Sequence, residues 1–149
     1  VAQDYLEGKS LDWESHLPAS KFMFHSCKSI LDRIDNIHAI ERTLFSEYLG
    51  VAGRVDCIAE FDGELAVIDF KTSEYIKPEE WLENYVVQET FYACAYYEMT
   101  GIPVKKLITI MQCPNGENHV FDKRNKDEYI KLLVEYIKKS VTTRHLPNA

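Results

Sequence analysis

Two aspartates and one lysine lie on two neighbouring stretches that have the pattern of β-strands and that an Asp-Gly turn joins. Asp56 belongs to the first stretch, Asp69 lies near the end of the second, and Lys71 follows two residues later. A tight hairpin would place the two carboxylates side by side, and carboxylate oxygens are the ligands that Mg²⁺ and Mn²⁺ prefer. Alternation along an extended strand puts Asp69 and Lys71 on one face. The pattern indicates a divalent-metal site.

Hydrolysis of a phosphodiester bond is the chemistry that such a site suits. It needs an activated water, neutralisation of the charge on the phosphate, and stabilisation of the leaving oxygen, all of which a bound Mg²⁺ or Mn²⁺ can supply. The backbone carbonyl of Phe70 could add a ligand to Asp56 and Asp69, and Lys71 could orient the water or offset phosphate charge. Asp69 follows a buried apolar run, where a carboxylate without a partner is costly. A structural salt bridge, or two unrelated surface acids, is the alternative interpretation.

A second pair of polar residues lies on the helix that is expected to follow. Gln88 and Tyr92 are four residues apart and therefore share one helical face. Gln can bind a metal-bound water or a phosphate, and Tyr can stack on a base or hydrogen-bond to a backbone oxygen. The alternative is that Tyr92 is a core residue among its aromatic neighbours.

The elements that must position these residues follow from periodicity and turn residues. The predicted order is helix, helix, three strands, helix, two strands and helix, over residues 1–8, 19–33, 37–48, 51–61, 64–70, 78–99, 104–112, 118–121 and 125 or 127–141. Gly8 closes the first helix, and an interruption is expected near Asn84. Asp62-Gly63 and Asn115-Gly116 are expected to form hairpin turns. The strand–helix–strand crossover over 64–112 implies one parallel pair, hence an α/β fold with a mixed sheet of about five strands flanked by helices.

Composition narrows the class of protein. The chain has 149 residues, of which 46% are hydrophobic and 28% charged, as expected for one globular domain over residues 1–149. Its apolar runs are too short to cross a membrane. The net charge of −7 argues against a protein that coats duplex DNA. The four cysteines form no CxxC pair, which argues against a zinc ribbon, and we expect reduced thiols in a cytoplasmic compartment, with the mitochondrial matrix as the second choice.

Taken together, three segments resemble the PD-(D/E)XK nuclease superfamily, which has a restriction-endonuclease-like core. They are Gly53-Arg-Val-Asp56, Ile68-Asp69-Phe70-Lys71-Thr72-Ser73 and Gln88-x-x-x-Tyr92, and they occur in order with family-like spacing. The resemblance covers residues from about 37 to 112 and is greatest to the RecB-type exonucleases, which include mitochondrial and phage enzymes. It is more specific than any one of the three segments.

The resemblance implies a role for each matching residue. Asp56 and Asp69 would bind Mg²⁺ or Mn²⁺, Lys71 would be the catalytic lysine, and Gln88 and Tyr92 would form a helical motif that supports the active site. Further positions follow as contacts of lower rank: Thr72 and Ser73 where the family often contacts the DNA backbone, and Glu41 where an acid is frequent, with Glu47 as a weaker candidate for that acid.

One element of the family is expected but not found. RecB-type members usually carry Gly-x-x-x-His on the first helix, and this histidine completes the metal shell. Residues 1–8 look like the continuation of that helix, so the chain is expected to begin after the histidine. None of the five histidines has that context, and His25 is the only stand-in; the others are His16, His38, His119 and His145. The clustered cysteines of the family's iron–sulfur members are also lacking, so no cluster is expected.

The function expected from the sequence is a metal-dependent DNA exonuclease. It would act on single-stranded or frayed ends in replication, recombination or repair, with proteins of those processes as partners and no membrane association. The alternatives are a structure-specific endonuclease of the same superfamily and a nuclease-fold DNA-binding module without turnover. Because a degenerate relative would lose Asp69 or Lys71, and both are present, the pattern favours the enzyme.

Overall fold

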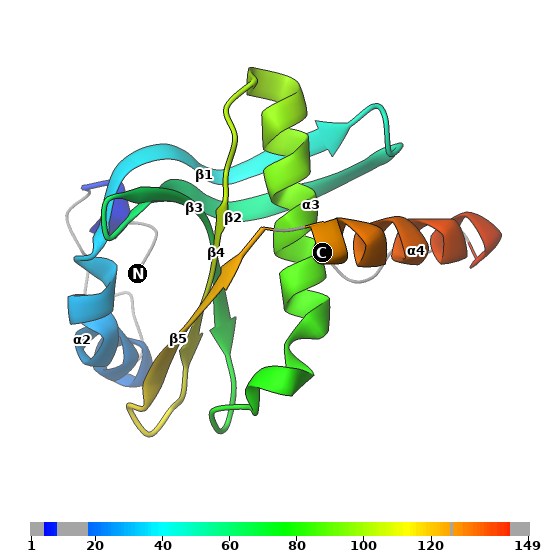
Figure 1. Ribbon diagram of the computed structural model, residues 1–149. Helices are drawn as coiled ribbons and strands as arrows, with labels where there is room; N and C mark the ends of the chain where they lie inside the picture. The colour runs from blue at the N-terminus through cyan, green and yellow to red at the C-terminus, as the bar shows by residue number, and fades with distance from the viewer. Residues whose placement is uncertain (1–4, 9–17, 126, 144–149) are drawn as a thin grey trace.

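A five-stranded sheet with helices on both faces forms the molecule (Figure 1). The computed structural model describes residues 5–8, 18–125 and 127–143. The elements in chain order are α2 (Pro18–Leu31), β1 (Ile34–Ser46), β2 (Val51–Phe61), β3 (Glu64–Thr72), the short 3-10 helix η2 (Glu79–Trp81), α3 (Glu83–Thr100), β4 (Lys106–Gln112), β5 (Asn118–Arg124) and α4 (Asp127–Thr143).

The sheet is mixed, with the strands in the order β1-β2-β3-β4-β5. Antiparallel pairs join β1 to β2, β2 to β3 and β4 to β5, whereas β3 and β4 are parallel. The parallel pair arises because α3 crosses from the end of β3 to the start of β4, a connection that cannot be a hairpin. The predicted fold class, an α/β fold with one parallel pair, is confirmed.

The hairpin between β2 and β3 has the tight turn that its sequence predicts. Asp62 and Gly63 have φ values of 52° and 83°, and Phe61 pairs directly with Glu64 across the turn. Two successive positive φ angles match the twist of the flanking strands, and Asp-Gly is among the residue pairs that adopt them readily. The turn therefore fixes the register that brings Asp56 toward the end of β3.

The second predicted turn, at Asn115-Gly116, is wrong in its length. Five residues, 113–117, connect β4 to β5, and only Gly116 has a positive φ, of 91°. The Cys113 amide donates to the Glu117 carbonyl, and the Asn115 side chain accepts a hydrogen bond from the Glu117 amide. Because the Asn115 side chain forms this local turn, its backbone need not adopt the left-handed conformation.

Several element boundaries also differ from the predicted ones. The first strand begins at Ile34 rather than residue 37, because an irregularity between Asp35 and Ala39 lets the strand pass through a pair of turn-forming residues. The predicted helix over 78–99 is divided at Leu82 into η2 and α3, and Gly101, with a φ of 76°, ends α3. Strand β5 continues to Arg124, three residues past its predicted end. Of the predicted first helix, only residues 5–8 are described, and Gly8 has a positive φ.

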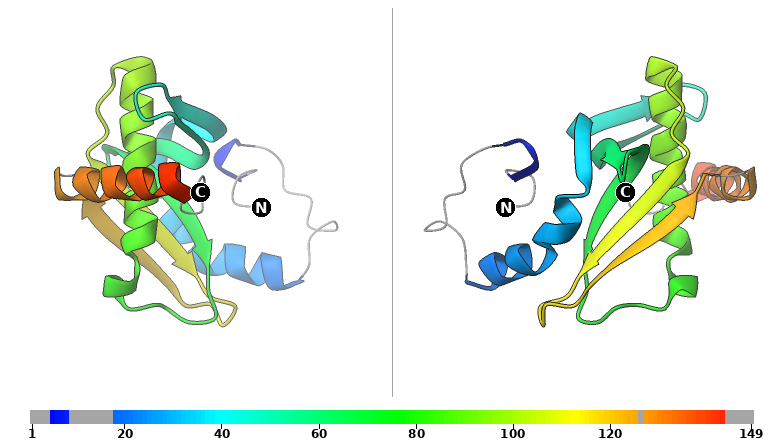
Figure 2. Two further views of the ribbon diagram at one scale, coloured as in Figure 1. Left: turned by 90° about the vertical axis from the view of Figure 1, so that its right-hand side faces the viewer. Right: turned by 60° about the vertical axis from the view of Figure 1, so that its left-hand side comes forward.

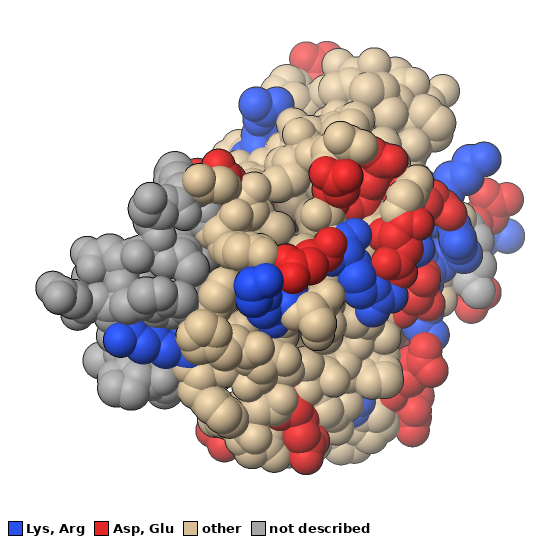
Figure 3. Space-filling view, turned by 90° about the vertical axis from the view of Figure 1, so that its left-hand side faces the viewer, with Lys and Arg blue, Asp and Glu red and all other residues tan. Residues whose placement is uncertain are grey.

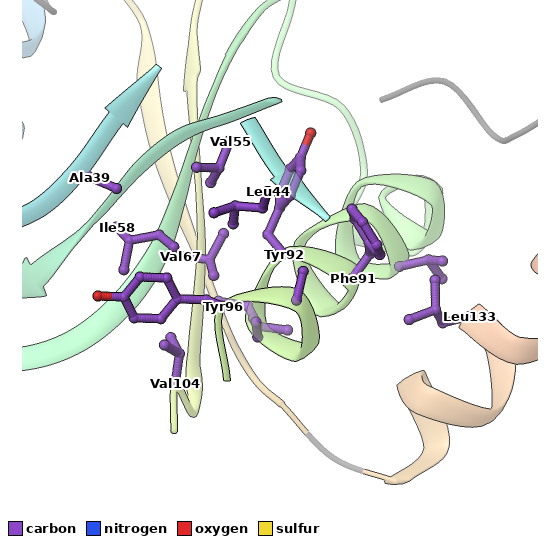
Figure 4. Packing of buried hydrophobic residues seen from close by; sticks show 14 of the residues in the cluster. Ala39, Leu44, Val55, Ile58, Val67, Phe91, Tyr92, Tyr96, Val104 and Leu133 are labelled. Carbon is purple, nitrogen blue, oxygen red and sulfur yellow. The ribbon is translucent and has the colours of Figure 1, made fainter. Parts of the chain in front are cut away.

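The helices lie on opposite faces of the sheet. Helix α2 covers one face, and α3 with α4 covers the other (Figures 1 and 2). Residues Phe24, Cys27 and Leu31 of α2 pack against inward residues of β2, β3 and β4, including Ile68. On the opposite face Tyr92 and its neighbours on α3 pack against β1, β2 and β3 (Figure 4). This separation decides which strand residues face α3.

Surface and redox features agree with a chain that does not wrap DNA. On the face shown in Figure 3, Lys and Arg side chains alternate with Asp and Glu, and the described residues there form no continuous basic area. Among the described helices, none is both long enough and apolar enough to span a bilayer. All four cysteines are free thiols, and Cys27, Cys57 and Cys113 are buried.

Candidate active site

The two aspartates meet where β2 and β3 part. Cys57 and Ile68 form the last pair of the β2–β3 ladder, and Asp56 and Asp69 are the residues immediately beyond it. Asp56 Oδ2 accepts a hydrogen bond from the Phe70 amide at 2.9 Å, which ties the two strands together past their last backbone pair. Ile68 and Phe70 pack toward α2, so alternation along β3 directs Asp69 and Lys71 to the face covered by α3.

Burial sets the electrostatics of Asp69. The residue is only 4% exposed, and this burial, with a contribution from the adjacent Asp56 carboxyl, raises the pKa of Asp69 to about 7. The Lys71 ammonium acts in the opposite direction and lies 3.1 Å from Asp69 Oδ2. Its approach is off the direction of a hydrogen bond, so Oδ2 accepts none from the described residues. The site therefore holds more negative charge than its own lysine neutralises.

This arrangement fits a divalent cation. The donors are hard carboxylate oxygens, one of them a buried atom without a hydrogen bond. The N–H of Phe70 points to the β2 side, and the carbonyl of a strand residue points to the same side as its N–H, so the Phe70 carbonyl faces the same gap as Asp56. Among the described residues no three His, Cys, Asp or Glu side chains are placed to hold an ion by themselves. The set is thus two carboxylates and a carbonyl.

Helix α3 supplies a chain of hydrogen bonds behind the acids. Lys71 Nζ lies 3.5 Å from Gln88 Oε1, the Gln88 amide donates to Tyr92 Oη at 3.1 Å, and Tyr92 donates to the Arg54 carbonyl at 2.8 Å. Tyr92 is 1% exposed, and its burial raises the pKa of its hydroxyl to about 12, so the hydroxyl keeps its proton and can donate. The two interpretations of Tyr92 are thus not exclusive, since its ring is in the core and its hydroxyl belongs to the site.

Two substitutions separate these contributions of Tyr92. Tyr92→Ala should lower the free energy of unfolding by about 3–5 kcal/mol, because it removes a fully buried ring. Tyr92→Phe should cost only about 1–2 kcal/mol, because it keeps the ring and loses the hydrogen bonds to Gln88 and Arg54. Urea unfolding of the two variants and of the wild type checks both values. Equal losses would show that the hydroxyl, rather than the ring, carries the stability.

Residues that the sequence analysis did not single out also lie at the site. Glu89 is fully buried beside Gln88, and one of its oxygens accepts a hydrogen bond from the Thr109 hydroxyl on β4 while the other has no partner among the described residues. Burial, then the charge of Asp69, raises the pKa of Glu89 well above its usual range. The signal was a charged residue inside the apolar stretch of α3. Tyr85, one turn before Gln88, lies with its ring 4.8 Å from Lys71 Nζ.

Other predicted residues lie at or near the site, or away from it. Glu41 lies on β1 between residues paired with Cys57 and Val55, and its carboxylate pairs with Arg54 (Oε2–Nε 2.9 Å), rather than with the two aspartates. Its own φ is 49°. The remaining predicted contacts lie as follows: Ser73 directly follows β3, Thr72 is on the face of β3 opposite Lys71 by alternation, Glu47 lies in the β1–β2 turn near Glu98, and His25 is on α2 across the sheet, while His16 and His145 fall outside the described residues.

Comparison with known proteins gives the family to which this geometry corresponds. A family model described as the PD-(D/E)XK nuclease superfamily matches residues 11–144. Mitochondrial genome maintenance exonuclease 1 is 45% identical in Mus musculus and 43% identical in Homo sapiens over 53 residues, which are 36% of this chain and 16% and 15% of those proteins. One component of the ATP-dependent helicase/nuclease of Clostridium botulinum (strain Alaska E43 / Type E3) is 34% identical over 61 residues, 41% of this chain and 5% of that protein.

A solved structure has a similar fold. It is a protein of Eubacterium rectale that is named provisionally as an exonuclease, and it superposes with a TM-score of 0.60 over 95% of this chain and 62% of its own. Because the two sequences are 9% identical, the likeness concerns the fold alone. The chain matches only a small share of the mammalian and clostridial relatives, so their whole-protein activities do not transfer with the match.

Proposed function

This chain belongs to the PD-(D/E)XK nuclease superfamily, and from that premise we propose that it is a metal-dependent exonuclease that hydrolyses phosphodiester bonds at DNA ends. The observation that carries the proposal is the contact of Asp56, Asp69 and Lys71 at the gap between β2 and β3. A site that concentrates buried negative charge beside one ammonium group is suited to a cation and a phosphate, and it would be a costly device for stability alone.

Asp56, Asp69 and the Phe70 carbonyl are the groups that would hold Mg²⁺ or Mn²⁺. The bound ion would supply Lewis-acid stabilisation of charge and a water of lowered pKa. Asp56 is held in place by the Phe70 amide, and Asp69 by the end of a strand buried on both faces, so both carboxylates are positioned before any ion binds. Their rigidity supports the assignment, since little reorganisation is needed on binding.

Lys71 and Gln88 are the groups that would act on the substrate. The Lys71 ammonium lies between Asp69 and the Gln88 carbonyl oxygen, and its side chain is 26% exposed, so it can also reach a phosphate oxygen or an attacking water. Tyr92 fixes the orientation of the Gln88 amide by accepting its hydrogen bond, and Tyr92 itself is fixed by the Arg54 carbonyl. Tyr92 is therefore a positioning residue in this proposal.

Action from an end, rather than within a strand, rests on the relatives. Two of them are named as exonucleases, and the third is named as part of a helicase/nuclease. The single-stranded or frayed ends that arise in replication, recombination and repair are the substrates we propose on this basis. The four free cysteines are consistent with a reducing compartment.

Metal removal and the shape of the substrate test the proposal. We expect the chain to degrade end-labelled linear single-stranded DNA with Mg²⁺ or Mn²⁺, and EDTA in excess to reduce the rate to background. Covalently closed circles of the same sequence should remain intact. Cutting of circles would replace the exonuclease with an endonuclease of the same family. DNA binding without cleavage under any metal would indicate a binding module instead.

A further inference from the structure

Two lysine side chains share the ring of Tyr85, beside the acids of the site. Lys71 Nζ is 4.8 Å from the ring centroid and Lys77 Nζ is 5.6 Å from it. Lys77 also donates a hydrogen bond to the Tyr85 hydroxyl at 3.2 Å. Cation–π contacts of this length hold an ammonium group in place without neutralising its charge. Tyr85 therefore holds a second cation next to the Lys71 that contacts Asp69.

The segment that carries Lys77 is anchored on both sides. Ile76 and Tyr85 pack against the buried cluster of Leu82, Met111 and Phe121. At its start the Ser73 amide donates to the Gln112 carbonyl, and at its end the turn of η2 closes with hydrogen bonds from residues 81 and 82. Lys77 is itself half-buried. These contacts give its ammonium group a defined position relative to the end of β3.

Lys77 differs from the other lysines near the site in its partners. Lys71 pairs with Asp69, and Lys123 pairs with Glu79 from the same connection as Lys77. None of the ion pairs among the described residues includes Lys77. In a chain with a net charge of −7, a positioned cation without a carboxylate partner is suited to an anionic ligand.

We infer that Lys77, positioned by Tyr85, binds the DNA phosphate adjacent to the one that is cleaved. The inference rests on the proposed function, which places the scissile phosphate beside Asp56, Asp69 and Lys71. Successive phosphates of a strand are about 3.4 Å apart along the axis of a duplex, so two cations around one ring can contact neighbouring phosphates. Lys77 would thus set the register of the strand in the site, while Lys71 acts at the bond that breaks.

The salt dependence of binding tests this contact. Lys77→Gln is compared with Lys105→Gln, which removes the same charge from an exposed residue that precedes β4, at the end of that strand away from Lys71. Binding of a labelled single-stranded oligonucleotide is measured with EDTA, in an Asp69→Asn background so that the DNA is not consumed. Loss of one phosphate contact should reduce the slope of log K against log salt by about 0.7 and weaken binding roughly threefold to tenfold. The Lys105 variant should keep the wild-type slope.

A neutral phosphate in the DNA identifies the partner of Lys77. A methylphosphonate at one of the two positions flanking the scissile phosphate should weaken binding by the parent protein but cause no further loss in Lys77→Gln, and Lys77→Arg should restore sensitivity to it. An unchanged slope, or additive losses at both flanking positions, would overturn the inference while the proposed function stands. If the wild type neither bound nor cut DNA, the proposed function would fail, and the role of Lys77 with it.

Discussion

Asp69→Asn is expected to remove metal-dependent cleavage, with a fall in rate of roughly 10³-fold or more. The amide keeps the shape of the side chain but not the charge, so it is a poor ligand for a divalent ion and leaves Lys71 without its ion pair. End-labelled linear DNA with Mg²⁺ and Mn²⁺ in turn measures the loss. Glu135→Gln, a neutralised carboxylate on the exposed face of α4, is the matched control and should cut at the wild-type rate.

The same substitution should stabilise the metal-free fold above neutral pH. The pKa of Asp69 is about 7 in the folded chain against 3.8 for an aspartate in its ordinary environment, so the folded state binds its proton more tightly than the unfolded state does. The stability of the wild type should therefore fall as the pH rises from about 4 to about 7, and the full penalty, at most about 4 kcal/mol, is present above that range. Because Asn carries no charge, Asp69→Asn should lose most of this pH dependence.

Urea unfolding at pH 5 and pH 8 in EDTA measures this difference. The wild type should be less stable at pH 8 than at pH 5, and Asp69→Asn should be more stable than the wild type mainly at pH 8. Removal of the Asp69 charge should also relieve the buried Glu89, whose pKa Asp69 raises. A variant that is less stable than the wild type at pH 8 would show that the metal-free site does not store this unfavourable charge.

Lys71→Met is expected to reduce turnover by roughly 10²- to 10⁴-fold while the chain stays folded and still binds metal. Methionine keeps an unbranched side chain against Tyr85 and removes only the ammonium group that faces Asp69 and Gln88. Because the Lys71 side chain is 26% exposed, its loss creates no closed cavity. The effect should lie in kcat more than in KM if the ammonium acts on the bond that breaks.

Calorimetric titration with Mn²⁺ and a thermal melt accompany the assay of the Lys71 variant. The Mn²⁺ affinity should be retained, since Asp56 and Asp69 remain and the competing ammonium is gone. Lys105→Met, at an exposed lysine distant from the acids, should match the wild type in all three measurements. Cleavage by Lys71→Met at the wild-type rate would remove Lys71 from the proposed mechanism.

Local physics explains which features the sequence predicted. The Asp62-Gly63 turn needs only two residues that tolerate positive φ, and the alternation that places Asp69 and Lys71 on one face needs only an extended strand. A strand, helix and strand in succession can close into one sheet only with a parallel pair. The fold class and the approach of Asp56 to Asp69 were therefore available before the structure.

Contacts between segments far apart in the chain were decided by tertiary packing. Glu89 meets Thr109, Tyr92 meets the Arg54 carbonyl, and Lys77 meets Tyr85 beside Lys71 only because α3 lies across the sheet at one angle and depth. Glu41 was predicted from a family pattern, yet its partner is Arg54, a choice made where β1 bends at a positive φ. The sequence by itself determined which strands and turns bring the two aspartates together, because those depend on neighbouring residues. The tertiary structure alone decided which side chains surround them, because burial and distance are properties of the packed chain.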